Sequence, residues 1–141
     1  MEVQVDMLAV VLAALSSMVV GSIWYARPVF GNVWIKLARI DVKQNAAGAK
    51  MAYALGATLV VSFLTAYVLA HVTYLSNQFF QESYLHDALM TGFWLWLGFI
   101  AARFITHDAF EGRRKKLTIL NITHELVTIM VMALIIGALQ P

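Results

Sequence analysis

Cysteine is absent from this 141-residue chain, and proline occurs only twice. Without cysteine there is no thiol nucleophile, no disulfide relay and no thiolate ligand for a metal, which excludes the membrane thiol oxidoreductases. Charge is also scarce, because only 13% of the residues are charged whereas 61% are hydrophobic. A soluble globule of this size needs more polar surface, so the composition indicates an integral membrane protein.

The N-terminus lacks positive charge. Residues 1–6 contain Glu2 and Asp6 but neither lysine nor arginine, whereas a secretory signal peptide begins with a basic region. We therefore expect the first apolar run to remain as a membrane span. The net charge of +2 is explained by basic loops beside anionic lipids, so the sequence carries no sign of nucleic-acid binding.

All ten lysine and arginine residues fall in two stretches, residues 27–50 and 103–116. The two tails and residues 75–87 carry none. The four segments left between these regions are apolar, and each is about as long as the roughly 20 residues that a helix needs to cross a bilayer. Basic loops are retained in the cytoplasm, so both stretches should lie inside, with both termini on the non-cytoplasmic side.

The fold class that follows is all-α: a four-helix transmembrane bundle in a single domain, residues 1–141. We expect spans at about residues 7–25, 50–74, 88–106 and 117–139. Between the first two spans, apolar residues from 28 to 40 recur at intervals of three and four. This period predicts a short amphipathic helix lying on the inner leaflet.

Small residues recur at every fourth position along one side of the first span: Ala9, Ala13, Ser17 and Gly21. Such a row lets helix backbones approach closely in lipid, so we expect it to face another helix. A mildly polar stripe follows on the second span: Thr58, Ser62 and Thr65. We interpret these hydroxyls as hydrogen-bonding groups between helices.

The segment between the second and third spans, residues 76–87, mixes aromatic and polar side chains and is expected to be a loop at the outer headgroups. His86 and Asp87 stand together at its end. Two adjacent residues supply too few ligands for a defined metal site, so we expect a solvated pair.

The chemical focus of the chain is a polar stripe on the last span. Its members lie three or four residues apart on one helix face, with His124 beside them: Thr118, Asn121, Glu125 and Thr128. Glu125 is expected roughly 12 Å along the span, too deep for a short acid to reach the headgroups. An ionised carboxylate there costs several kcal/mol unless it faces protein or water.

Three accounts of Glu125 remain open. In the first, Glu125 and His124 form a proton-titrating or cation-binding site, with Asn121 and Thr128 as hydrogen-bonding partners. In the second, Glu125 pairs with Arg103 on the neighbouring span, although Arg103 also suits the role of a snorkelling anchor. In the third, a protonated Glu125 donates a hydrogen bond between subunits.

Known catalytic and metal-binding patterns are missing. His107, Asp108, His124 and Glu125 lack a zinc-binding spacing, and no second histidine follows His124 as the metalloprotease motif requires. Neither a hydrolase elbow nor a phosphate-binding loop is present. We therefore expect no catalytic residue, no metal and no cofactor.

The residues after the first span form a distinctive motif: Gly21, Trp24, Tyr25, Phe30, Gly31 and Trp34. A second motif precedes the last span and continues into it: Phe110-Glu111-Gly112-Arg113, Leu117, Asn121 and His124. Over nearly its whole length the chain resembles a small bacterial membrane family, domain of unknown function 1761. The resemblance implies four spans in a bacterial cytoplasmic (inner) membrane and implies no activity. The aromatic motif is either an interfacial anchor or a binding surface.

Two functions follow from these residues. The first is a small oligomeric permease or channel-like protein with a proton- or cation-linked site at Glu125, His124 and Asn121. The second is a noncatalytic membrane module that binds lipid, an apolar ligand or a partner protein through the aromatic motif. The expected partners are membrane lipids and further copies of the chain, as a dimer or trimer, with an unspecified small-molecule or ion cargo and no nucleic acid.

Overall fold

The structure, a computed structural model, describes residues 3–41, 48–139 and 141. Within this part of the chain the secondary structure is entirely helical. The elements, in chain order, are α1 (Met7–Trp24), a π-helical turn (Arg27–Gly31), α2 (Asn32–Ala38), α4 (Ala49–Phe80), α5 (Tyr84–Leu95), a second π-helical segment (Trp96–Ala101), α6 (Ala102–Phe110) and α7 (Lys115–Leu139).

Four helical rods are long and apolar enough to cross a membrane: Met7–Trp24, Ala49–Phe80, Tyr84–Phe110 and Lys115–Leu139. The third rod joins α5, the second π-helical segment and α6 without a break. The all-α four-helix bundle expected from the sequence is therefore confirmed, and it is compatible with a multi-pass membrane protein. The Asp6 carboxylate begins the first rod by accepting hydrogen bonds from the N–H groups of Leu8 (2.8 Å) and Ala9 (3.4 Å).

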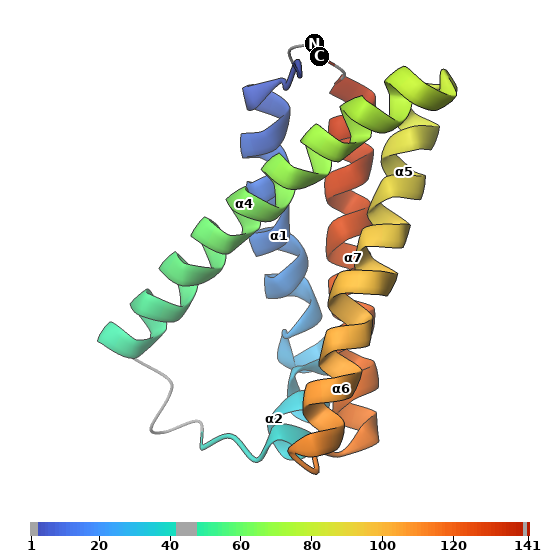
Figure 1. Cartoon of the computed structure of the whole chain (residues 1–141). Helices are drawn as coiled ribbons and strands as arrows, with labels where there is room; N and C mark the ends of the chain where they lie inside the picture. Colours follow the sequence, from blue (N-terminus) through green and yellow to red (C-terminus); the bar gives the residue numbers. More distant parts are fainter. Residues whose placement is uncertain (1–2, 42–47, 140) are drawn as a thin grey trace.

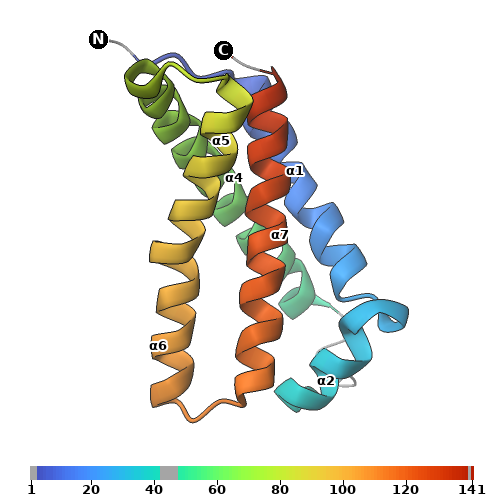
Figure 2. The same ribbon diagram turned by 90° about the vertical axis from the view of Figure 1, so that its right-hand side faces the viewer.

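Both basic stretches lie at the same end of the bundle, opposite the two termini (Figure 1). Figure 2 shows α2 and the turn between α6 and α7 together at this end. Lys43 lies outside the described residues. The charge pattern therefore correctly predicted which turns share an end, and we call this the basic end and the opposite one the terminal end.

The turn at the terminal end is tighter than expected. Instead of a loop over residues 76–87, only residues 81–83 separate α4 from α5. Asn77 Nδ2 closes this turn by donating to the carbonyl oxygen of Glu82 (2.9 Å), and Ser83 Oγ caps α5 by accepting from the N–H of His86 (3.3 Å). The expectation of a solvated His86–Asp87 pair is wrong for Asp87, which is only 2% exposed.

The amphipathic segment at the basic end forms two short helical elements instead of one helix. The helix expected over residues 28–40 is a π-helical turn containing Pro28, followed by the short α2. Arg39 ends α2 in the left-handed conformation, with φ of 55°. α2 contacts α7, so this segment packs on the bundle itself.

The small-residue row of α1 faces the other helices, as the sequence predicts. Ala9, Ala13 and Ser17 are buried, and Ser17 Oγ donates a hydrogen bond to Ser62 Oγ on α4 (2.7 Å). α5 and α7 also approach closely, because a Cβ atom added at Gly137 would lie 2.8 Å from the Cα atom of Leu85. Backbone proximity replaces the hydrophobic driving force that lipid does not supply.

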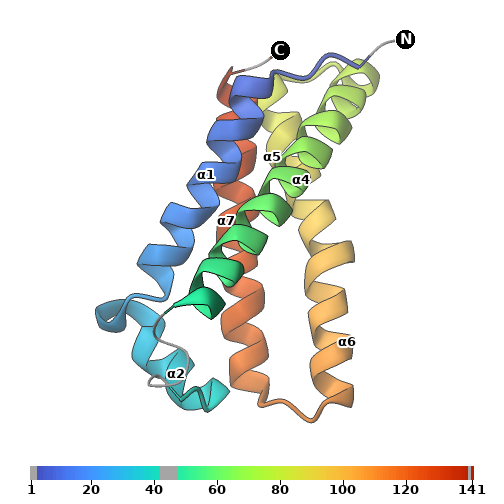
Figure 3. The ribbon, with the colours of Figure 1, turned by 90° about the vertical axis from the view of Figure 1, so that its left-hand side faces the viewer.

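α4 crosses the bundle at a steep tilt (Figures 1 and 3). Residues 49–61 of this helix are not buried, and its buried residues begin at Ser62: Ser62, Ala66, Leu69, Ala70 and Thr73. A Cβ atom added at Gly56, in the first half, would meet no other atom within 4 Å. The first half of α4 therefore diverges from α7 and leaves space beside it.

The turn between α6 and α7 is held by a buried carboxylate. Asp108 is 5% exposed, and its Oδ2 accepts a hydrogen bond from Thr118 Oγ1 (2.6 Å). Arg113 Nε lies 3.7 Å from Asp108 Oδ1, and the N–H of Arg113 donates to the carbonyl oxygen of Asp108 (2.9 Å). Thr118, which we expected in the stripe around Glu125, is thus engaged by this turn.

Replacing Thr118 with Val should lower the free energy of unfolding by about 1–3 kcal/mol, because a buried carboxylate loses its hydroxyl donor. Thermal unfolding in detergent, followed by circular dichroism, measures the loss. Thr106→Val is the matched control, since the exposed Thr106 bonds only the carbonyl oxygen of Ala102 on its own helix. Equal melting temperatures for the two variants would contradict a stabilising role for the Asp108 contact.

Candidate functional site

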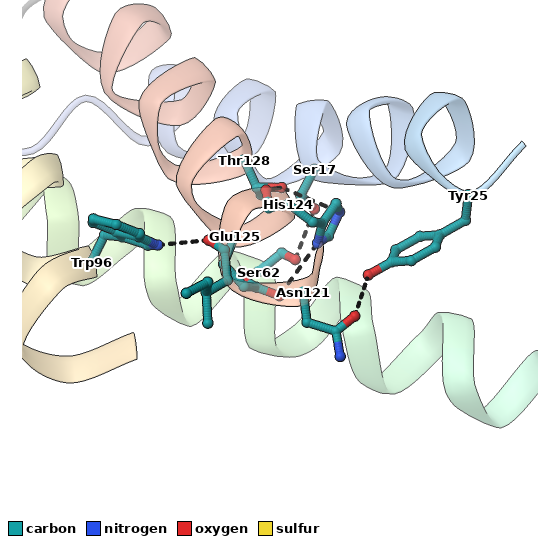
Figure 4. Close-up of polar contacts among 9 residues, drawn as sticks. Ser17, Tyr25, Ser62, Trp96, Asn121, His124, Glu125 and Thr128 are labelled. Carbon is teal, nitrogen blue, oxygen red and sulfur yellow. Dashed lines mark hydrogen bonds and ion pairs between the residues drawn. The ribbon is translucent and has the colours of Figure 1, made fainter. Parts of the chain in front are cut away.

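The polar groups of α7 centre on His124. Its Nδ1 lies 3.5 Å from Glu125 Oε1, and its Nε2 lies 3.4 Å from Thr128 Oγ1. The Thr128 hydroxyl also donates to the carbonyl oxygen of His124 (2.9 Å). Figure 4 shows these side chains beside Asn121 on the same helix. Three of the predicted site residues therefore share direct contacts, and the side chain of Glu125 remains 35% exposed.

The aromatic motif from the end of α1 surrounds the same histidine. The His124 ring centroid lies 4.9 Å from that of Tyr25 and 5.9 Å from that of Trp24. Phe30 packs on Trp24 at 4.5 Å, and Trp34 packs on Tyr25 at 5.0 Å. The two features that we treated as rivals in the sequence, the aromatic motif and the polar stripe, thus form one site.

Tyr25 links the motif to the stripe through a hydrogen bond as well. Its hydroxyl donates to Asn121 Oδ1 (3.3 Å), as drawn in Figure 4. Burial, together with the nearby charge of Glu125, raises the pKa of Tyr25, the cap residue just beyond α1, to about 12. The phenol therefore remains protonated at neutral pH and keeps its role as donor.

A cavity of about 340 Å³ lies where α4 diverges from α7. Its polar lining residues come from both helices: Thr58, Ser62, Thr65, Glu125 and Thr128. Of the three hydroxyls of α4 that we expected to bond between helices, only that of Ser62 does so, with Ser17. The hydroxyls of Thr58 and Thr65 donate to carbonyl oxygens of α4 itself. The spacing of these hydroxyls in the sequence indicated a polar face on α4. The sequence did not indicate the tilt of α4 that opens the cavity.

The π-helical segment Trp96–Ala101 borders the same cavity through Ile100. Trp96 Nε1 donates a hydrogen bond to the carbonyl oxygen of Ile122 on α7 (2.8 Å), which fixes this segment one turn from Glu125. π-Helical segments inside longer helices occur frequently at functional sites. Sequence periodicity did not reveal this one.

A second cavity, of about 420 Å³, lies at the basic end. Its lining includes Tyr25, Trp34, Asn121 and Glu125, with Arg113 from the turn between α6 and α7. Glu125 is the single residue shared by the linings of the two cavities. The carboxylate therefore stands between a space at the basic end and a space in the middle of the bundle.

Arg103, the remaining predicted site residue, lies elsewhere. It is exposed and lines neither cavity. The ion pairs of the described residues do not include one between Arg103 and Glu125, whose partner is His124. The structure thus does not form the Arg103 pair of the second account.

Metal ligation has little geometric basis in this site. Among residues 3–41, 48–139 and 141, no group of three or more His, Asp or Glu side chains is placed to hold a metal ion. His124 and Glu125 alone supply two ligands. Asp108, the acid that we considered beside them, is engaged by Thr118.

Replacing Gly31 with Ala should disrupt the aromatic side of the site. A Cβ atom there would lie 2.3 Å from the carbonyl oxygen of Tyr25 and 2.8 Å from the backbone of Ala26, neither of which can move freely. We expect a loss of about 1–3 kcal/mol in stability and a weaker near-ultraviolet circular dichroism signal from the displaced aromatic rings.

Gly98→Ala is the matched control for this variant, because a Cβ atom at Gly98 meets no other atom within 4 Å. Its spectrum and melting temperature should stay close to those of the unmodified chain. If both variants behaved alike, the tight packing between Gly31 and Tyr25 would not hold the aromatic rings in place.

Comparison with known proteins places the chain in a family. No curated protein and no solved structure matches it. The model of the family described as "Protein of unknown function (DUF1761)" matches residues 8–137, which include every residue of the site and all four helical rods except the first residue of the first and the last two of the fourth. The chain therefore belongs to the DUF1761 family.

Proposed function

We propose that this protein is a small membrane permease or channel-like protein with a proton- or cation-linked site at Glu125. The observation that carries the proposal is the position of this carboxylate in the linings of both cavities. A group that faces two separate spaces can accept an ion from one and release it to the other. Ionisable residues inside membrane helices commonly mark such pathways.

The neighbours of Glu125 supply the chemistry that this role needs. His124 Nδ1, at 3.5 Å, exchanges a proton with the carboxylate or stabilises its charge when protonated. Thr128 positions the other ring nitrogen, and the rings of Tyr25 and Trp24 shield the imidazole. Hydroxyls of α4 line the cavity beyond and offer oxygen atoms to a passing proton or cation.

The direction of this path follows from charge. Lysine and arginine are retained on the cytoplasmic side, so the basic end and its cavity face the cytoplasm in this proposal. Both termini then lie on the non-cytoplasmic side, in the inner membrane of a bacterium. The cavity between α4 and α7 lies further toward the terminal end, since it includes Met132 of α7.

A homo-oligomer, dimer or trimer, completes the proposal. Residues 49–61 of α4 are not buried, and Ala57 and Thr58 of this stretch border the cavity beside it. A second copy packed there would close the cavity toward lipid, which a polar pathway requires because hydrocarbon does not solvate ions.

The test is ion flux through proteoliposomes. We expect an imposed membrane potential to drive proton entry, read with a trapped pH-sensitive dye, and Glu125→Gln to reduce that rate at least tenfold by removing the titrating group. Glu82→Gln is the control, because this exposed acid lies at the terminal end, outside both cavities. Unchanged flux in Glu125→Gln, or wild-type flux equal to that of empty liposomes, would refute the proposal.

The second candidate function is a noncatalytic module that binds lipid, an apolar ligand or a partner protein. Three aromatic residues, Tyr25, Trp34 and Phe104, line the cavity at the basic end.

Trp34→Ala separates this candidate from the first. It should reduce the amount of lipid or protein that co-purifies, measured by native mass spectrometry, because the cavity loses the indole ring that forms part of its lining. Tyr53→Ala should leave that amount unchanged, because it removes an aromatic ring that is 79% exposed on α4 and lies outside this cavity. An unaltered complement of bound molecules in Trp34→Ala would count against the module.

A further inference from the structure

The protein contains a further cavity that is larger than the two around Glu125. A cavity of about 510 Å³ lies along α4 and α5, nearer the terminal end, and shares no residue with the two around Glu125. Its volume falls within the range of about 300–1,000 Å³ that is typical of small-molecule sites. Its acidic side chains lie beside the turn after α4, and Trp94 and Phe99 lie farther along the third rod.

The acidic end is built by Glu82, His86 and Asp87. Asp87 is only 2% exposed, and its Oδ2 accepts a hydrogen bond from Asn77 Nδ2 of α4 (2.8 Å). Its Oδ1 lies 3.8 Å from His86 Nδ1, whose side chain is largely exposed. The carboxylate is thus held in place by a neutral amide, which leaves its negative charge without a permanent cationic partner in the described part of the chain.

The sequence keeps positive charge away from this cavity. No lysine or arginine occurs between Lys50 and Arg103, the interval that contains every residue of its lining. Only His86 among these residues can become positive. Two carboxylates without a lysine or arginine nearby give the mouth of the cavity a negative potential, which favours a cation and repels an anion.

Apart from Ser76 and Thr91, the rest of the lining is apolar. Part of it comes from α4, and the longer part follows the third rod. Met90, Trp94 and Phe99 extend from Asp87 over twelve residues, or roughly 18 Å at the rise of an α-helix. Trp94 is 59% exposed, so its ring is open to a ligand. Aromatic faces attract cations as well as apolar groups, most of all the face of tryptophan.

We propose that this cavity binds a lipophilic organic cation, an ammonium or phosphonium carrying apolar substituents. The positive centre lies near Asp87 and Glu82, and the substituents lie against Trp94 and Phe99. A neutral acyl chain would leave the buried carboxylate without a counter-charge, and an anionic amphiphile would meet repulsion at the mouth. The combination of charge and apolar surface therefore selects this class.

The test uses two ions of nearly the same shape and opposite charge, tetraphenylphosphonium and tetraphenylborate. Binding to the full chain in nanodiscs of neutral lipid is measured by equilibrium dialysis, with empty nanodiscs as the reference. We expect saturable binding of tetraphenylphosphonium alone. Asp87→Asn should weaken it at least tenfold, and Trp94→Ala should weaken it several-fold.

Two further variants keep the result interpretable. Glu82→Gln alters an exposed acid, so it should fold even if Asp87→Asn does not, and it should weaken binding several-fold. Glu125→Gln should leave tetraphenylphosphonium binding unchanged, which separates this cavity from the proposed ion path. Comparable binding of both ions, no saturable binding, or full binding in folded Asp87→Asn and Glu82→Gln would overturn the proposal.

Discussion

A carboxylate inside an apolar helix has to be partnered, and the arrangement around Glu125 meets this constraint. The helix α7 crosses the whole bundle, so Glu125 cannot reach either end by extending its short side chain. His124 supplies a polar contact at 3.5 Å, and two cavities supply space for solvation. The aromatic motif at the end of α1 packs on His124. The residues that follow α1 at the basic end are therefore positioned by the same histidine that partners Glu125.

Departures from straight, parallel helices create the space that the site needs. The tilt of α4 separates its first half from α7, and the π-helical segment Trp96–Ala101 borders the resulting cavity. Elsewhere the helices pack closely, as at Gly137, where no side chain fits. Tight packing at the terminal end and divergence toward the basic end are therefore complementary, because the first holds the bundle together while the second leaves room for polar groups.

The two ends of the bundle have opposite chemistry. The described lysine and arginine residues lie toward the basic end, whereas Glu82 lies in the turn between α4 and α5 and the buried Asp87 in the first turn of α5. The two buried aspartates have different surroundings as a result. Asp108 lies beside Arg113 and Thr118 and stabilises a turn, while Asp87 has the neutral amide of Asn77 and borders an open cavity. The same residue type thus serves structure at one end and is available for recognition at the other.

The sequence by itself determined the number of helical rods, the end that each turn occupies, the close packing of α1 and the position of Glu125 within the last rod. These properties depend on hydrophobic length, charge position and helical period, all of which are local. Only the tertiary structure decided that Tyr25 and Trp24 enclose His124, that Asp87 is buried, and that Arg103 does not meet Glu125. Helical period specifies which residues share a face. The helix that each face contacts depends on the tilt and rotation of the helices, and these arise from packing among all four.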